Sequence, residues 1–217
     1  MSLLKKEIRL CMHPTAYLMM GMFLMLLIPN YPYLVSFFYT TLGIFFIFIT
    51  ARENHDAAFT LSLPLSRRDA VMGRMLLCLI LEAIQLALSA LVLPLHRVLL
   101  GDLPNSAGMD ANIALIGEGF LVFSLFNLLF FPTLYRDINK VGRAFALSCV
   151  GLGAFIIADI AATYVIPLFR DVLDTPDPAF LKEKIIFLIA CVLCFALAFT
   201  LSFRLSVKRF QQVDLQL

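Results

Sequence analysis

Six runs of apolar residues, separated by short polar connections, fill most of this sequence. A helix needs roughly 17 to 25 such residues to cross the hydrocarbon core of a bilayer, and five of the runs reach that length unaided. The first run is shorter and needs residues from one of its flanks. The sequence therefore predicts an all-α integral membrane protein with six transmembrane helices, near Thr15–Ile28, Tyr33–Thr50, Ala70–Leu95, Ile113–Leu134, Ala144–Pro167 and Ile185–Leu205.

The composition excludes several other classes of protein. Hydrophobic residues make up 61% of the 217 residues and charged residues 15%, whereas a soluble domain is about 45–50% apolar. Six spans use about 120 residues, so residues 1–217 are expected to form one transmembrane domain with no room for a soluble catalytic domain. No run of five like charges occurs, and nucleic acid is therefore not an expected partner.

The distribution of lysine and arginine predicts the orientation, because cytoplasmic connections retain these residues. Thirteen of them lie in one alternating set of connections and four in the other. We therefore expect both termini on the cytoplasmic side and an even number of spans. The cytoplasmic set is Lys5, Lys6, Arg9, Arg52, Arg67, Arg68, Arg74, Arg136, Lys140, Arg143, Arg204, Lys208 and Arg209, and the outer set is Arg97, Arg170, Lys182 and Lys184.

Residues 1–12 have the pattern of an amphipathic helix. Helical spacing places Leu4, Ile8 and Cys11 on one stripe and the basic residues mostly elsewhere, although Glu7 interrupts the apolar side. This pattern favours a helix that lies on the inner membrane surface before the first span. A frayed basic tail is the alternative. Because no small-x-small cleavage site follows, we expect the first run to be an uncleaved span.

The connection at residues 52–69 is predicted to hold a short cytoplasmic helix of its own. Glu53 to Ser62 suits two to three helical turns, with acidic residues near the start where the helix dipole favours them. Pro64 stops that helix, and Ser66 to Asp69 has the spacing of a capping box that opens the third span. The apolar residues of the short helix indicate a protein partner, and packing on its own bundle is the alternative.

At these residues the chain resembles the permease subunits of type-2 ATP-binding-cassette (ABC) exporters, the short six-span bacterial kind. These include the bacitracin-resistance and phenol-soluble-modulin exporters. The resemblance rests on an acidic segment followed by Leu-Pro-x-Ser-Arg, here residues 63–67. A second similarity lies between the fourth and fifth spans, where Asp137-Ile138-Asn139 replaces an expected aromatic-Gly pair. Its residues are Pro132, Tyr135, Lys140 and Arg143.

The resemblance implies that the short helix is a coupling helix that docks in a groove of an ABC ATPase subunit. The implied docking residues are Glu53, Asn54, Asp56 and Phe59, and the implied coupling turn contains Pro64, Ser66 and Arg67. It also implies a second permease copy or paralogue, a bacterial cell membrane, and export of an amphipathic or hydrophobic substrate such as an antimicrobial peptide or a lipid-like molecule.

ATP and Mg²⁺ would bind to the partner subunit, because this chain has no Gly-x-x-x-x-Gly-Lys-Ser/Thr loop. A His-Glu-x-x-His zinc motif and a Gly-x-Ser-x-Gly nucleophile motif are also missing from the sequence. We therefore expect a chain that is not an enzyme and holds neither a cofactor nor a metal.

Acidic residues inside the spans are the remaining candidates for function. A charge deep in a bilayer costs at least about 2.5–3.5 kcal/mol, so Glu82, Glu118 and Asp159 should face the bundle interior, a cavity or one another. Glu118 is expected to be shallow, near the headgroups. The acids could line a cation-attracting export path or form structural hydrogen bonds. The alternative function is an ion- or proton-coupled secondary transporter using Glu82 and Asp159, and a membrane scaffold is a third hypothesis.

Overall fold

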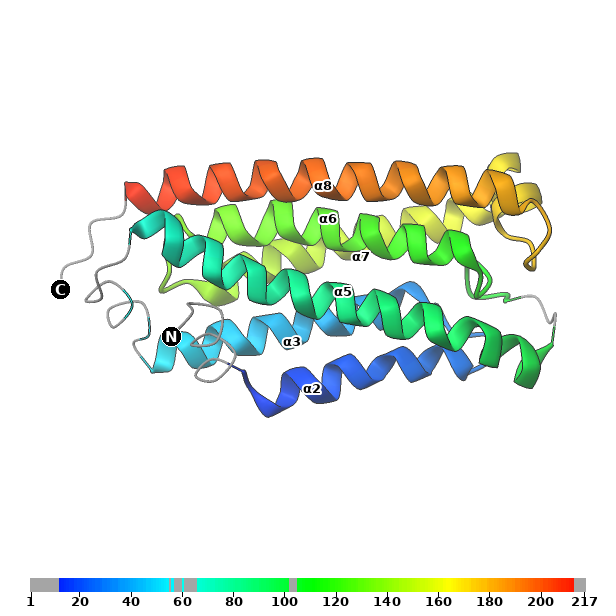
Figure 1. The fold of residues 1–217 in the computed structure, drawn as a ribbon, viewed down its shortest axis with the longest axis horizontal. Coiled ribbons are helices and arrows are strands. Elements are labelled where there is room, and N and C mark those ends of the chain that lie inside the picture. Colours follow the sequence, from blue (N-terminus) through cyan, green and yellow to red (C-terminus); the bar gives the residue numbers. More distant parts are fainter. Residues whose placement is uncertain (1–11, 55, 57–59, 61–65, 102–104, 213–217) are drawn as a thin grey trace.

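The computed structural model describes residues 12–54, 56, 60, 66–101 and 105–212. All regular structure within this part is helical (Figure 1). The α-helices are α2 (Pro14–Met20), α3 (Leu34–Glu53), α5 (Arg67–Leu100), α6 (Ile113–Leu134), α7 (Val141–Val165) and α8 (Leu181–Gln211). A 3₁₀ segment, η1 (Gly21–Leu27), continues α2, and a π-helical turn, η2 (Phe169–Leu173), follows α7.

Five helices, α3 and α5 to α8, are long and apolar enough to cross a membrane. The first apolar run is shorter, as predicted, and consists of seven α-helical residues followed by seven 3₁₀ residues. Because a 3₁₀ helix rises about 2.0 Å per residue instead of 1.5 Å, the two segments together reach about 25 Å. The 3₁₀ geometry thus partly compensates for the small number of residues.

The predicted bounds were confirmed for α6, whereas α5 and α8 are longer than their apolar runs. α5 continues through Pro94 to Leu100, so His96 and Arg97 belong to this helix and not to a connection. A single proline removes one backbone hydrogen bond but does not end a helix whose other residues are packed. The apolar pattern missed the polar ends of both helices.

α5 crosses the bundle diagonally (Figure 1). Near its start, Arg67 donates hydrogen bonds to the last carbonyls of α8, and near its end His96 Nδ1 lies 2.5 Å from the carbonyl oxygen of Leu26 in η1. α5 therefore contacts α8 at one end of the molecule and η1 at the other. We call the first of these the basic end. There α2, α5 and α7 begin and α3, α6 and α8 end.

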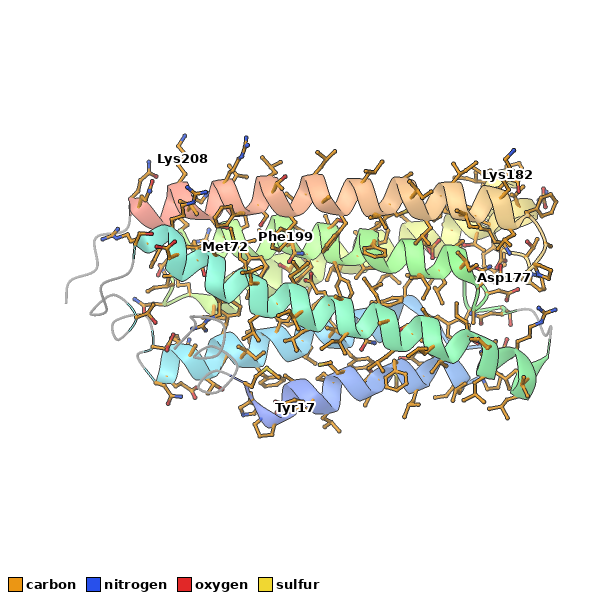
Figure 2. All side chains as sticks on the ribbon, viewed as in Figure 1. Tyr17, Met72, Asp177, Lys182, Phe199 and Lys208 are labelled. Atoms are coloured by element: carbon orange, nitrogen blue, oxygen red, sulfur yellow. The ribbon has the colours of Figure 1, made fainter. Side chains whose placement is uncertain are left out.

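The core is aromatic and centres on α6. Phe126 stacks on Phe130 with ring centroids 4.9 Å apart, and Phe48 of α3 meets Phe130 edge-on at 5.2 Å. α6 is the most buried of the long helices, whereas α7 and α8 are the least buried. Figure 2 shows side chains of α8 projecting outward along the length of that helix. α7 and α8 therefore present much of the exposed apolar surface of the described residues.

Gly119 of α6 lies where three helices approach closely. A Cβ atom built there would come within 2.8 Å of Leu86 in α5 and of Phe37 in α3. We expect Gly119→Ala to lower the free energy of unfolding by about 1–3 kcal/mol through overpacking. Gly153→Ala in α7 is the control, because nothing lies within 4 Å of that position. Thermal unfolding in one detergent measures both, and equal midpoints would contradict the close approach.

Candidate functional site

The start of α5 is fixed by the predicted capping box, which the structure confirms. The backbone N–H of Asp69 donates to Ser66 Oγ at 3.1 Å, and that of Ser66 donates to Asp69 Oδ2 at 3.3 Å. Ser66 has the extended backbone angles that are typical of an N-cap residue. Phe59 and Pro64 lie outside the described residues.

The predicted start of a separate helix at Glu53 is wrong, because Glu53 is the last residue of α3 and Asn54 is its C-cap. The apolar face of α3 continues through Ala51, which is buried, and this packing keeps the chain helical beyond the apolar run. Both Glu53 and Asn54 are exposed at the basic end. They are therefore accessible to a partner, as a docking role requires.

Asp56 is buried and forms an ion pair with Arg74 of α5, which is also buried. The hydroxyl of Thr60 donates to the same carboxylate oxygen at 3.3 Å, and the guanidinium of Arg74 lies 5.4 Å from the ring centre of Phe48 in α3. The carboxylate of Asp56 thus faces the bundle. It fastens the segment after α3 to the second turn of α5.

Two arginines bind backbone carbonyls at the C-terminal ends of α6 and α8, at the basic end. Arg67 donates to the carbonyl oxygens of Phe210 and Gln211, at 2.9 and 3.1 Å, and its guanidinium also lies over the ring of Phe210. Arg209 donates in turn to the carbonyl oxygen of Pro132 at 2.6 Å. Cations are favoured at helix C-termini, where carbonyls lack intrahelical partners. The predicted coupling-turn residue Arg67 therefore connects α5 directly to α8.

Glu82 lies fully buried between α5 and α6. Its carboxylate accepts a hydrogen bond from Asn127 Nδ2 at 3.1 Å, and Ser202 of α8 donates to the backbone carbonyl of Asn127 at 2.5 Å. A polar cluster thus joins three helices in the apolar interior. This geometry is what interhelical hydrogen bonds in a membrane protein require.

Glu118 lies near the start of α6, as expected, but its side chain is fully buried, which contradicts the expectation that it faces the headgroups. It sits in the first turns of α6, where α7 covers it, and its carboxyl interacts with that of Asp159 on α7. Of the three predicted path residues, the structure thus brings Glu118 and Asp159 together and pairs Glu82 with Asn127.

Two further acids continue from this pair toward the end opposite the basic end. Asp174 accepts a hydrogen bond from the backbone N–H of Asp110 at 2.7 Å. Burial is the main reason that the pKa of Asp174 is raised to about 6. The charges of Asp110 and Asp159 also raise this pKa, whereas the hydrogen bond from Asp110 and the charge of Lys184 lower it. The carboxyls of Glu118, Asp159, Asp174 and Asp110 thus form a connected group of acids, with the ammonium group of Lys184 close to Asp110 and Asp174.

Two buried cations, Arg74 and Lys184, were not predicted as site residues, because in the sequence they count only as basic residues of connections. Lys184 is fully buried, and its ammonium group donates to the carbonyl of Thr175 and to Asp177 Oδ1, the latter at 3.0 Å. Their position in the sequence could have indicated that they are buried. Each lies several residues inside the helix that follows its connection, where a charge requires a partner.

The fold and these sites define an all-helical, multi-pass membrane protein. The sequence matches the family described as ABC-2 family transporter protein over residues 2–211. The chain therefore belongs to the ABC-2 family, whose members are the membrane components of ABC transporters. Neither a curated protein nor a solved structure matches it.

Proposed function

We propose that this chain is the membrane-spanning permease subunit of an ATP-driven exporter in the bacterial cell membrane. It crosses the bilayer six times, with the basic end and both termini in the cytoplasm. It pairs with a second permease copy or paralogue, and each copy binds an ATPase subunit that holds ATP and Mg²⁺. The substrate is amphipathic or hydrophobic, such as an antimicrobial peptide or a lipid-like molecule. Family membership over almost the whole chain is the observation that carries this proposal.

The junction at the basic end supports the coupling mechanism. A push on the segment at residues 52–69 reaches α5 through the ion pair of Asp56 with Arg74. It reaches α8 through the bonds from Arg67 to the last carbonyls of that helix. α5 crosses to η1 at the opposite end, so a tilt of α5 moves both ends of the bundle. Such rigid-body motions are a common route to alternating access.

Phe59→Ala tests the docking role of this segment. An aromatic anchor in a protein interface typically contributes about 2 kcal/mol or more to binding, so the variant should lose the ATPase in a mild-detergent pull-down. It should still insert with unchanged topology. Phe180→Ala is the matched control, because Phe180 is an exposed aromatic residue at the opposite end.

Pro64→Ala should retain some binding of the ATPase but lose substrate-stimulated ATP hydrolysis.

The exporter proposal fails if Phe59→Ala binds and stimulates the ATPase like the parent. It also fails if the parent copurifies with no protein that carries a P-loop. Misfolding of Phe59→Ala would mean that the segment packs on its own bundle and is an ordinary loop.

A second candidate, the ion- or proton-coupled secondary transporter, is favoured by the buried acids. Beyond their mutual interaction, both carboxyl oxygens of Glu118 and Oδ2 of Asp159 have no hydrogen-bond partner among the described residues. A buried carboxyl with this environment is a site for a proton or a cation.

The two candidates differ in vesicles that lack the ATPase. The exporter proposal predicts no substrate movement there. With the ATPase present, Asp159→Asn should change transport severalfold while thermal stability stays nearly constant, because the amide keeps the shape and removes the charge. Glu82→Gln should change transport less, since Glu82 is bonded to Asn127. Uptake without ATPase that Asp159→Asn abolishes would favour the second candidate.

A further inference from the structure

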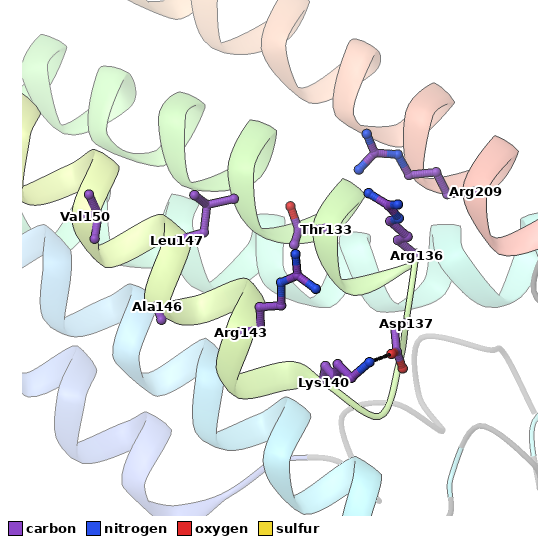
Figure 3. A pocket seen from close by; sticks show the side chains of 9 residues that line it. All are labelled: Thr133, Arg136, Asp137, Lys140, Arg143, Ala146, Leu147, Val150 and Arg209. Carbon is purple, nitrogen blue, oxygen red and sulfur yellow. Dashed lines mark ion pairs between the residues drawn. The ribbon is translucent and has the colours of Figure 1, made fainter.

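A cavity of about 730 Å³ opens at the basic end, where α6 ends, α7 begins and the last turn of α8 passes (Figure 3). Its lining includes none of the residues assigned to ATPase docking, although Arg52 donates to the backbone carbonyl of Asn139 next to it. Its lining divides into a charged part and an apolar part. The lining residues are Thr133, Arg136, Asp137, Lys140, Arg143, Ala146, Leu147, Val150 and Arg209.

The charged part contains four cations and one acid. Lys140 neutralises Asp137 at 2.8 Å, and Arg209 uses one nitrogen on the carbonyl of Pro132. Arg136 is exposed and forms no ion pair with any of the described residues. Arg143 is exposed on the first turn of α7. Apart from the ion pair of Lys140 with Asp137, the guanidinium groups of Arg136, Arg143 and Arg209 remain around the cavity. A guanidinium fork is suited to bidentate binding of a phosphate group.

The apolar part follows α7 away from the charges. Leu147 is 47% exposed and Val150 is 72% exposed, about one turn apart on α7, and Ala146 also lines the cavity. α7 is one of the two least buried of the long apolar helices, so this face is open to the acyl chains of surrounding lipid. A ligand that fills the cavity therefore meets cations at one end and hydrocarbon at the other. This combination describes an amphiphile with an anionic head.

We propose that this cavity binds an anionic phospholipid of the inner leaflet. The phosphate lies between Arg136, Arg143 and Arg209, and an acyl chain runs along Leu147 and Val150. Basic pockets beside transmembrane helices on the cytoplasmic side are suited to anionic headgroups. An acidic side chain of a protein partner would satisfy the arginines but would leave the apolar wall uncovered. The apolar wall is the reason to assign a lipid.

The test compares retention of phosphatidylglycerol with that of phosphatidylcholine by native mass spectrometry of the full chain. The parent should prefer phosphatidylglycerol. Because each cation near an anionic lipid contributes about fivefold in affinity, Arg136→Gln with Arg143→Gln should weaken its binding about 30-fold. Arg204→Gln with Lys208→Gln removes the same charge from exposed positions of α8 outside the cavity and should change binding little. Lys208 points away from the bundle (Figure 2).

A third variant, Val150→Gln, separates a lipid from a free phosphate. It should weaken phosphatidylglycerol severalfold and leave the weak binding of glycerol phosphate unchanged. The proposal is overturned if the cavity variant retains phosphatidylglycerol like the α8 control. It is also overturned if Val150→Gln has no effect, which would indicate a phosphate site. Loss of ATPase copurification with unchanged lipid retention would assign the cavity to the ATPase instead.

Discussion

Arg74→Ala should lower the free energy of unfolding by about 3–5 kcal/mol, the usual effect of removing one partner from a buried ion pair. The substitution leaves the buried carboxylate of Asp56 without its cation and removes the guanidinium from the ring of Phe48. Arg68→Ala is the control, because Arg68 is exposed on the same helix. Thermal or denaturant unfolding in detergent measures both variants.

A double-mutant cycle separates the ion pair from simple packing. Asp56→Leu with Arg74→Met removes both charges and should recover most of the lost stability, because the cost lies in the unpaired buried charge. The recovered protein should still couple ATP hydrolysis to export poorly, since the segment is no longer fastened to α5. Additive losses in the double variant would show that the two side chains act independently.

Lys184→Met should lower the free energy of unfolding by about 3 kcal/mol, and this effect arises at the end opposite the basic end. Lys184 is fully buried and holds Asp177 and the carbonyl of Thr175. Asp177 in turn accepts a hydrogen bond from the first backbone N–H of α6, at Ile113. Loss of the ammonium group therefore releases the connection that positions the starts of both α6 and α8.

Lys182→Met is the matched control for this prediction. It removes the same charge two residues away, where the side chain is exposed and points outward (Figure 2). Its effect should stay within about 0.5 kcal/mol, as for other surface substitutions. Equal losses of stability in the two variants would contradict this prediction. They would mean that stability depends on the positive charge at this end and not on the buried contacts of Lys184.

The helices could be predicted from the sequence because a bilayer leaves the backbone few alternatives. Apolar runs of sufficient length must be helical there, and the prediction for α6 was accurate at both ends. The capping box at Ser66 was equally local, since it needs only a hydroxyl and a carboxylate three residues apart. The end of α3 was predicted less well, because buried packing extends that helix to Glu53.

The pairing of the polar residues depended on tertiary structure. The sequence predicted that Glu82, Glu118 and Asp159 would avoid lipid, because the cost of a buried charge follows from the residue type alone. It did not indicate that Glu82 would meet Asn127 or that Glu118 would meet Asp159. These partners come from different helices, and their contacts depend on the rotation and crossing of those helices.

The sequence by itself determined the class of protein, the number of apolar runs and the concentration of basic residues at one end. These features depend on composition and on periodicity along the chain. The tertiary structure decided that Arg74 and Lys184 are buried and paired, that Arg67 joins α5 to α8, and that three arginines from separate helices and connections surround one cavity. These features required the tertiary structure because each contact joins residues that are far apart in the chain, or residues whose side chains face inward only because of how the helices pack.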